Sequence, residues 1–184
     1  MNRQLERYLL LLSRYRKKVN LTGTRDEEEL RSLIEDSLIP FPDEGRILDL
    51  GTGGGLPGLP LLLVHPRLQM AFLDKSRKKM NILSLILQQL DIPFPLLLTG
   101  EASRFSPDYA CFFDSVVSRG MGETEFVLEQ AAPFLKEGGR AWLWKPAGFM
   151  PENVTGKGYS FLAEERLDCS LCSVAVYRKR RGEG

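Results

Sequence analysis

The segment Ile47–Gly58 constrains the fold more than any other part of this chain. An apolar run with Ile47, Leu48 and Leu50 leads into a stretch with five glycines in eight positions. Glycine adopts positive φ angles and, because it has no Cβ, leaves the backbone open to close approach. Pro57 suits the first turn of a helix, where unpaired N–H groups can meet an anionic ligand. The segment therefore predicts a strand, a glycine-rich loop and a helix, which together form a nucleotide-type pocket in an α/β protein.

An acid precedes the glycines. Asp49 lies two residues before Gly51, and the order Asp-x-Gly-x-Gly-x-Gly is typical of sites for S-adenosylmethionine (SAM), where the acid faces a cationic ligand. We expect the methionine end of SAM to meet a group of residues in this loop, namely Asp49, Gly51, Thr52, Gly53, Gly55 and Leu56.

A dinucleotide site is the alternative for the same segment. Gly53-x-Gly55-x-x-Gly58 also fits G-x-G-x-x-G, and Asp74 follows at the distance of a ribose-binding acid. Both cofactors carry an adenosine ribose, so Asp74 is expected to accept its hydroxyls in either case. No tyrosine here is followed by lysine four residues later, so the Tyr-x-x-x-Lys proton donor of a NAD-dependent reductase is missing. This favours SAM.

The hydrophobic pattern predicts alternating strands and helices from residue 46 onward. Strands are expected at 46–50, 69–73, 95–98, 113–117 and 140–144, and helices at 58–64, 76–90 and 124–135, the last closed by Gly138-Gly139. Segments 159–167 and 171–178 are joined too closely for a helical crossover, so they predict an antiparallel hairpin. We therefore expect an α/β fold of the Rossmann-like class I SAM-dependent methyltransferase type, with a seven-stranded, mostly parallel sheet.

Two extra helices are expected before this core, at 3–18 and 26–38. Thr24-x-x-Glu27 resembles a capping box for the second of them. The prediction is a single methyltransferase domain over 1–184, with an N-terminal helical extension (1–45) and a SAM-binding core (46–184).

Composition limits the partners and the compartment. The formal net charge is only +1, so contact with a nucleic acid must rest on local basic clusters. The residues expected to contact RNA are Lys17, Lys18, Arg77, Lys78 and Lys79, and a third basic cluster lies at 178–181. The chain has no run of 18 apolar residues, which predicts that it has no membrane span. It has three cysteines, an odd number, which predicts a cytoplasmic protein without a disulfide framework. We expect a monomer without a metal. In Cys169-x-x-Cys172 the two side chains are expected to face opposite sides of a strand.

Several motifs occur together in a family-specific order. They are Asn20-Leu21-Thr22, Asp36-Ser37-Leu38, the stretch from Asp49 to Pro60 ending in Pro-Gly-x-Pro, Asp74 followed by Lys78-Lys79, Ser118-Arg119 and Lys145. This set resembles the bacterial 16S ribosomal RNA guanine-N7 methyltransferases, the RsmG or GidB family. The resemblance implies SAM as cofactor, 16S ribosomal RNA or the small ribosomal subunit as partner, and methyl transfer to guanine N7 without a general base.

The resemblance also implies further site residues. Ser118, Arg119 and Lys145 are expected to be catalytic, since they follow strands at the edge where open α/β sheets bind ligands. Asp74, Lys75, Glu101, Ala102 and Arg119 are expected to complete the cofactor site.

The chain departs from the family pattern at several of these positions. Leu33 stands where the family usually has histidine, Glu101-Ala102-Ser103 where it has Arg-Ala-Glu, Gly120 where it has alanine, and Pro146 where it has glycine. Two alternatives therefore stay open, namely a SAM- or RNA-binding ribosome-assembly module with weak or lost activity, and a methyltransferase for another acceptor.

Overall fold

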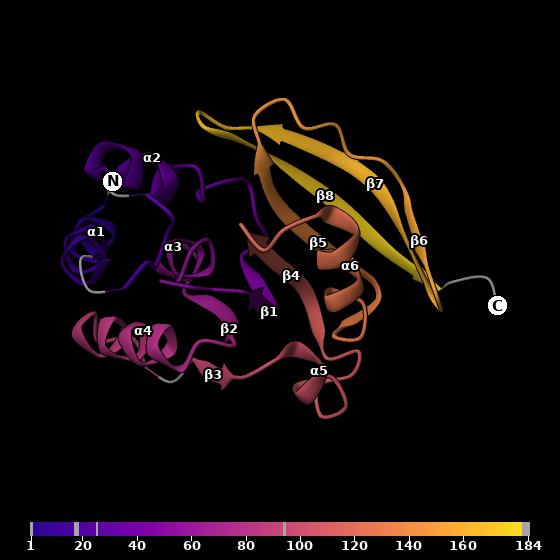
Figure 1. The fold of residues 1–184 in the computed structure, drawn as a ribbon, viewed down its shortest axis with the longest axis horizontal. Helices are drawn as coiled ribbons and strands as arrows, with labels where there is room; N and C mark the ends of the chain where they lie inside the picture. The colour runs from indigo at the N-terminus through magenta and orange to yellow at the C-terminus, as the bar shows by residue number, and fades with distance from the viewer. Residues whose placement is uncertain (1, 17–18, 25, 94, 182–184) are drawn as a thin grey trace.

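A computed structural model describes residues 2–16, 19–24, 26–93 and 95–181. Its centre is one sheet in the order β3-β2-β1-β4-β5-β8-β7-β6 (Figure 1). The strands are β1 (Glu44–Leu50), β2 (Arg67–Asp74), β3 (Leu96–Thr99), β4 (Phe113–Arg119), β5 (Leu135–Pro146), β6 (Val154–Gly156), β7 (Tyr159–Asp168) and β8 (Cys172–Arg181). The first five are parallel and the last three antiparallel. The expected architecture is confirmed, and the short β6 adds an eighth strand to the seven expected.

Six helices of the described chain cover the two faces of the sheet. They are α1 (Arg3–Arg16), α2 (Glu27–Glu35), α3 (Gly58–Val64), α4 (Arg77–Gln89), α5 (Ala102–Phe105) and α6 (Thr124–Ala131). Helices α1–α4 share one apolar cluster with strand residues such as Ile47 and Trp142, and α5 and α6 share another with Leu48 and Leu143. Figure 1 shows the same separation between the indigo-to-magenta helices and the orange α6. Alternate strand residues thus enter opposite cores, as the pleat requires.

Helix α1 confirms the first of the two helices expected before the core, and it is amphipathic. Its buried residues, Leu5, Tyr8, Leu9 and Leu12, recur at helical spacing. Helix α2 begins one residue later than expected, and the capping prediction for Thr24 was wrong. Asp26 is the N-cap, and its carboxylate accepts a hydrogen bond from Glu29 N at 2.7 Å.

Helix α6 is shorter than expected. It ends at Ala131, because Pro133, which follows directly after the C-cap, cannot continue a helix. The expectation that Gly138-Gly139 closes this helix was therefore wrong, because both glycines lie inside β5. The pairing of β5 with β4 shifts register between Phe113 and Ser115. Across the described ranges, no helix is both long and apolar enough to cross a membrane.

Candidate active site

The glycine loop after β1 is held across the carboxyl end of β2. The N–H groups of Gly51 and Thr52 donate to Leu73 O at 2.8 and 3.1 Å. Gly53 N donates to Asp74 Oδ2 at 3.0 Å, while Asp74 Oδ1 accepts from Ser76 N at 2.8 Å. Asp74 therefore links the glycine loop to the start of α4, where Ser76 is the N-cap.

Part of this loop is approached by the chain itself rather than left open for a ligand. A Cβ on Gly53 would lie 2.7 Å from Leu21 O, and Gly54 N donates to the same carbonyl at 3.2 Å. Gly53 has a φ of +56°, so both the contact and the backbone angle require glycine. Above Gly51 the nearest atoms belong to the flexible Met121 side chain, which can move aside. The segment Asn20–Gly23 thus forms a cover whose site role the sequence alone did not reveal.

Asp49 is fully buried beneath the loop. Its Oδ2 accepts hydrogen bonds from Thr52 Oγ1 at 2.8 Å and Gly58 N at 3.0 Å. Its Oδ1 has no hydrogen-bond partner among the described residues. Burial raises the pKa of Asp49 to about 7, against the opposing effect of the two hydrogen bonds. A cation near Oδ1 would favour the charged carboxylate, so the geometry suits a positively charged ligand.

A cavity of about 320 Å³ opens at the glycine loop that covers this acid. Its walls come from the glycine loop, the Asn20–Gly23 segment, Lys79 and Arg119. Arg119 donates from Nη1 to Leu33 O at 3.0 Å, and burial lowers its pKa. Leu33, one of the positions where the chain departs from the family pattern, therefore contacts Arg119 through its backbone carbonyl. A larger cavity of about 640 Å³ lies near the opposite end of the strands, around Arg46, Gln69 and Phe112, away from the predicted site.

The charge reversal at Glu101 is compensated locally. Glu101 Oε1 lies 3.7 Å from Lys75 Nζ, and both side chains are mostly exposed. The buried Ala102 follows as the first residue of α5. The structure therefore brings Lys75 and Glu101 together, with Ala102 following Glu101 in the chain, and their place in a cofactor site stays a prediction. An exposed ion pair of this kind contributes at most about 1 kcal/mol.

Ser118 and Lys145 lie at the ends of β4 and β5. The Ser118 hydroxyl is buried and donates to Leu50 O at 2.9 Å, which ties β4 to β1. Lys145 Nζ donates to Gly122 O at 2.9 Å, and burial lowers its pKa. The Ser118 hydroxyl and the Lys145 ammonium thus both have backbone partners, and the catalytic roles of the two residues stay predictions.

The basic clusters differ in their availability. Arg77 and Lys78 are exposed on the first turn of α4, whereas Lys79 lines the 320 Å³ cavity. In the 178–181 cluster, Arg178 pairs with Glu164, and the buried Lys179 donates to Ala132 O and Leu135 O at 2.6 and 2.7 Å. That cluster therefore serves packing in part. Lys17 and Lys18 lie outside the described residues.

Asp36 is the residue whose role the sequence analysis missed. Its carboxylate accepts hydrogen bonds from Ser170 N at 3.0 Å and Leu171 N at 2.8 Å, in the turn between β7 and β8. Cys169 and Cys172 flank this turn, and both Sγ atoms lie 3.7 Å from Asp36 oxygens. The expectation that the two thiols face apart was therefore wrong, because they flank a turn rather than lie along one strand. In the part of the chain that the structure describes, no group of three or more His, Cys, Asp or Glu side chains is placed to hold a metal.

Comparison with known proteins identifies the family of this chain. The family model for GidB, described as rRNA small subunit methyltransferase G, matches residues 1–166. A Streptococcus pneumoniae serotype 19F (strain G54) protein named ribosomal RNA small subunit methyltransferase G is 32% identical over 177 residues, covering 91% of this chain and 75% of that protein. The Lactococcus lactis subsp. cremoris (strain MG1363) protein of the same name is 33% identical over 163 residues, with coverages of 84% and 68%.

Solved structures share the fold at low sequence identity. The PH0226 protein from Pyrococcus horikoshii OT3 matches with a TM-score of 0.65 and 14% identity, over 91% of this chain and 98% of that one. The putative transferase PH0793 from Pyrococcus horikoshii matches with a TM-score of 0.63 and 13% identity, over 83% of this chain and 63% of that one. On the family match over most of its length and on these relatives, the chain belongs to the GidB family, the rRNA small subunit methyltransferases G.

Proposed function

We propose that this protein transfers a methyl group from SAM to N7 of a guanine in the 16S ribosomal RNA of the small ribosomal subunit. The single observation that carries the proposal is Asp49, a buried acid under a glycine loop, with one oxygen free of hydrogen-bond partners among the described residues. The family and the names of its relatives support small-subunit ribosomal RNA as the acceptor. The choice of N7 rests on the family resemblance of the motifs.

The glycine loop, which lines the 320 Å³ cavity, and the two acids that bond to it, Asp49 and Asp74, fit SAM. Asp49 supplies a negative charge for a cationic ligand, and the cavity's size is within the range of small-molecule sites. We assign Asp49 and the loop from Gly51 to Leu56 to the methionine end of SAM. Asp74 is assigned to the ribose, because each carboxylate oxygen accepts one backbone hydrogen bond and keeps a second lone pair.

Methyl transfer to N7 makes limited demands on the protein. SAM supplies a methyl group bound to a sulfonium sulfur. A nucleophile attacks the methyl carbon in line with the carbon–sulfur bond and displaces the sulfur. N7 carries a lone pair and no proton, so the site needs to orient the base and exclude water rather than remove a proton. Arg119 lines the cavity, and its remaining N–H groups can donate to guanine O6, as arginine does in guanine recognition.

RNA affinity is assigned to the first turn of α4 together with the N-terminal lysines. Arg77 and Lys78 are exposed there, directly after the assigned ribose acid. Lys17 and Lys18 remain part of the proposal from the sequence. Phosphate contacts of this kind make binding salt-dependent, and a looped or splayed guanine would provide the target.

The test is incubation with radiolabelled SAM and small ribosomal subunits from a strain that lacks the guanine-N7 mark. Chemical cleavage at N7-methylguanine then maps the label. Label at one guanine supports the proposal. SAM binding without label on guanine contradicts it and favours one of the two alternatives, a binding module or a different acceptor.

The acid provides a matched control for the cofactor assignment. The variant Asp49→Asn keeps the volume of the side chain and removes its charge. If Asp49 faces the methionine ammonium, the variant weakens binding of SAM and of S-adenosylhomocysteine equally. If it faces the sulfonium, only SAM is affected. Unchanged affinity for both compounds contradicts the assignment.

A further inference from the structure

The strand order separates two sides of the carboxyl edge of the sheet. Strands β1, β2 and β3 carry the glycine loop, Asp74 and Ala102, which we assign to the cofactor. Strands β4 and β5 continue the same edge on the other side of β1. An acceptor that meets the methyl group in line from beyond the cofactor therefore lies over the ends of β4 and β5.

The chain makes a tight turn directly after β5. Phe149 N donates to Pro146 O at 3.1 Å, and Gly148 has a φ of +78°. A β-turn with positive φ at its third position is a type II turn, which favours glycine there. The Gly148 N–H points away from the turn and is free to bond elsewhere.

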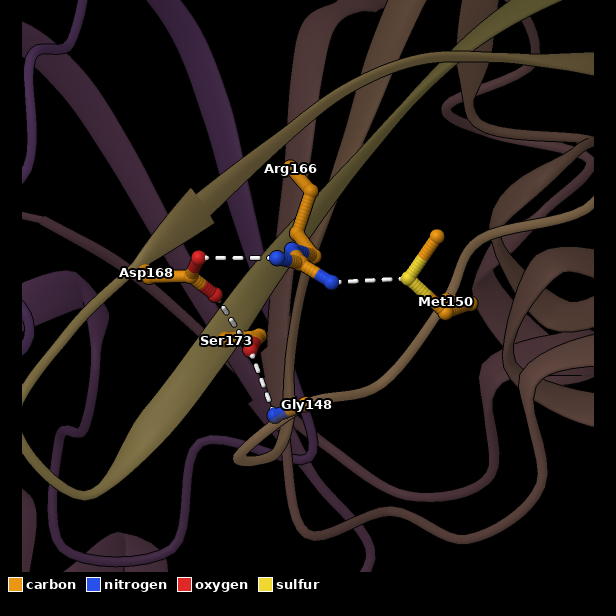
Figure 2. Close-up of polar contacts among 5 residues, drawn as sticks. All are labelled: Gly148, Met150, Arg166, Asp168 and Ser173. Carbon is orange, nitrogen blue, oxygen red and sulfur yellow. Dashed lines mark hydrogen bonds and ion pairs between the residues drawn. The ribbon is translucent and has the colours of Figure 1, made fainter.

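A chain of polar contacts fixes this turn to the C-terminal hairpin (Figure 2). Gly148 N donates to Ser173 Oγ at 3.1 Å, and Ser173 Oγ donates to Asp168 Oδ1 at 2.9 Å. Arg166 Nη2 donates to Asp168 Oδ2 at 2.9 Å, and Arg166 Nη1 lies 2.7 Å from Met150 Sδ. Ser173 is fully buried, so both functions of its hydroxyl are used inside the protein. The residues on either side of Phe149 are thus both anchored.

Phe149 itself faces the end of β5. Its ring centroid lies 5.5 Å from Lys145 Nζ, and Lys145 in turn bonds Gly122 O in the connection from β4 to α6. Phe149 is partly buried against the apolar cluster of α6 and retains exposed surface. Trp144, the other aromatic residue at this end of β5, is buried and donates to Asp36 O. Phe149 therefore offers a held aromatic ring on the acceptor side.

We propose that Phe149 is the stacking surface for the acceptor guanine and that Ser173 is a positioning residue that holds it there. This inference rests on the proposed function, since it names the acceptor contact of the same site. Purine bases stack on aromatic side chains whatever their sequence context.

The test compares Phe149→Leu, Phe149→Tyr and Ser173→Ala with a matched control, Phe126→Leu. Phe126 is an exposed aromatic residue on α6 without a place in the site. We expect Phe149→Leu to lower kcat/KM for small subunits about 10-fold or more, with SAM affinity unchanged. Phe149→Tyr should restore most of this loss, Ser173→Ala should show a smaller loss of the same kind, and Phe126→Leu should show none. An unchanged kcat/KM in Phe149→Leu, or an equal loss of SAM affinity, overturns the proposal.

A second readout separates this proposal from the proposed function. Saturation-transfer NMR with 7-methylguanosine monophosphate measures base binding without turnover. We expect transfer to the nucleotide with the wild-type protein and Phe149→Tyr, and a loss with Phe149→Leu. If the wild-type protein binds SAM but labels no guanine, the proposed function fails. In that case the nucleotide measurement still tests the Phe149 proposal. The proposal is overturned if the wild-type protein shows no saturation transfer to the nucleotide, or if Phe149→Leu shows the same saturation transfer as the wild-type protein.

Discussion

The protonation of Asp49 makes the stability of the cofactor-free protein depend on pH. Burial raises the pKa of this carboxyl from 3.8 to about 7 in the folded protein. In that range the folded state holds a proton that the unfolded chain has lost. The folded state therefore binds more protons, and stability falls as pH rises from about 4 through about 7. Asp49→Asn removes this titration and keeps the shape of the side chain.

The magnitude follows from the shift. A difference of about three pKa units corresponds to about 4 kcal/mol of stability once the group is ionised in both states. The loss is spread almost evenly between pH 4 and pH 7, at about 1.4 kcal/mol per pH unit, because over this whole interval the folded carboxyl keeps a proton that the unfolded one has lost. Between pH 5 and pH 8 the wild-type protein should therefore lose about 2–3 kcal/mol more than Asp49→Asn.

Urea denaturation of both proteins at pH 5 and pH 8, without SAM, measures this difference. Other groups that titrate in this range are common to both proteins and cancel in the comparison. Saturating SAM should reduce the wild-type pH dependence, since a cation near Oδ1 lowers the pKa of the acid. If both proteins lose the same stability between pH 5 and pH 8, Asp49 does not titrate there and the reasoning from its burial fails.

Three further substitutions test other parts of the structure. Asp74→Ala should weaken SAM binding at least about 10-fold, since it removes the assigned ribose acceptor and leaves Gly53 N and Ser76 N without their partner; calorimetry with unchanged affinity would contradict the ribose assignment. Arg119→Ala should lower turnover on small subunits more than SAM affinity, and equal losses would argue against a role toward the acceptor. Lys179→Met should lower the free energy of unfolding by about 3 kcal/mol, because it strands two buried carbonyls that accept charge-assisted hydrogen bonds; a loss below about 1 kcal/mol in urea denaturation would show that water replaces the ammonium.

Local patterns predicted most of the fold, and failed where several local signals competed. The stripe on α1 and the alternation of strands and helices were sufficient for the sheet and its terminal hairpin. At α2, Thr24 and Asp26 are both good caps, and only the path of the chain selects Asp26. At α6, Pro133 ends the helix before Gly138-Gly139 is reached, and the glycines enter β5 instead.

The site shows the same division. The sequence identified the glycine loop, its acid Asp49 and the ribose candidate Asp74, because their spacing along one strand–loop–helix unit is fixed by the backbone. It did not reveal that Leu21 covers the loop or that Lys75 compensates Glu101. The second of these pairs joins residues 26 positions apart that meet only when β2 and β3 align.

By itself, the sequence determined the class of fold, the place of the glycine loop and the family, since each depends on residues close together in the chain. Only the tertiary structure decided the environment of Asp49, whose pKa depends on burial by the folded chain. It also decided that Asp36 holds the hairpin turn 134 residues further on, and that Ser173 and Asp168 fix the turn carrying Phe149. Contacts of this kind depend on sheet register and packing between distant elements, which no local periodicity encodes.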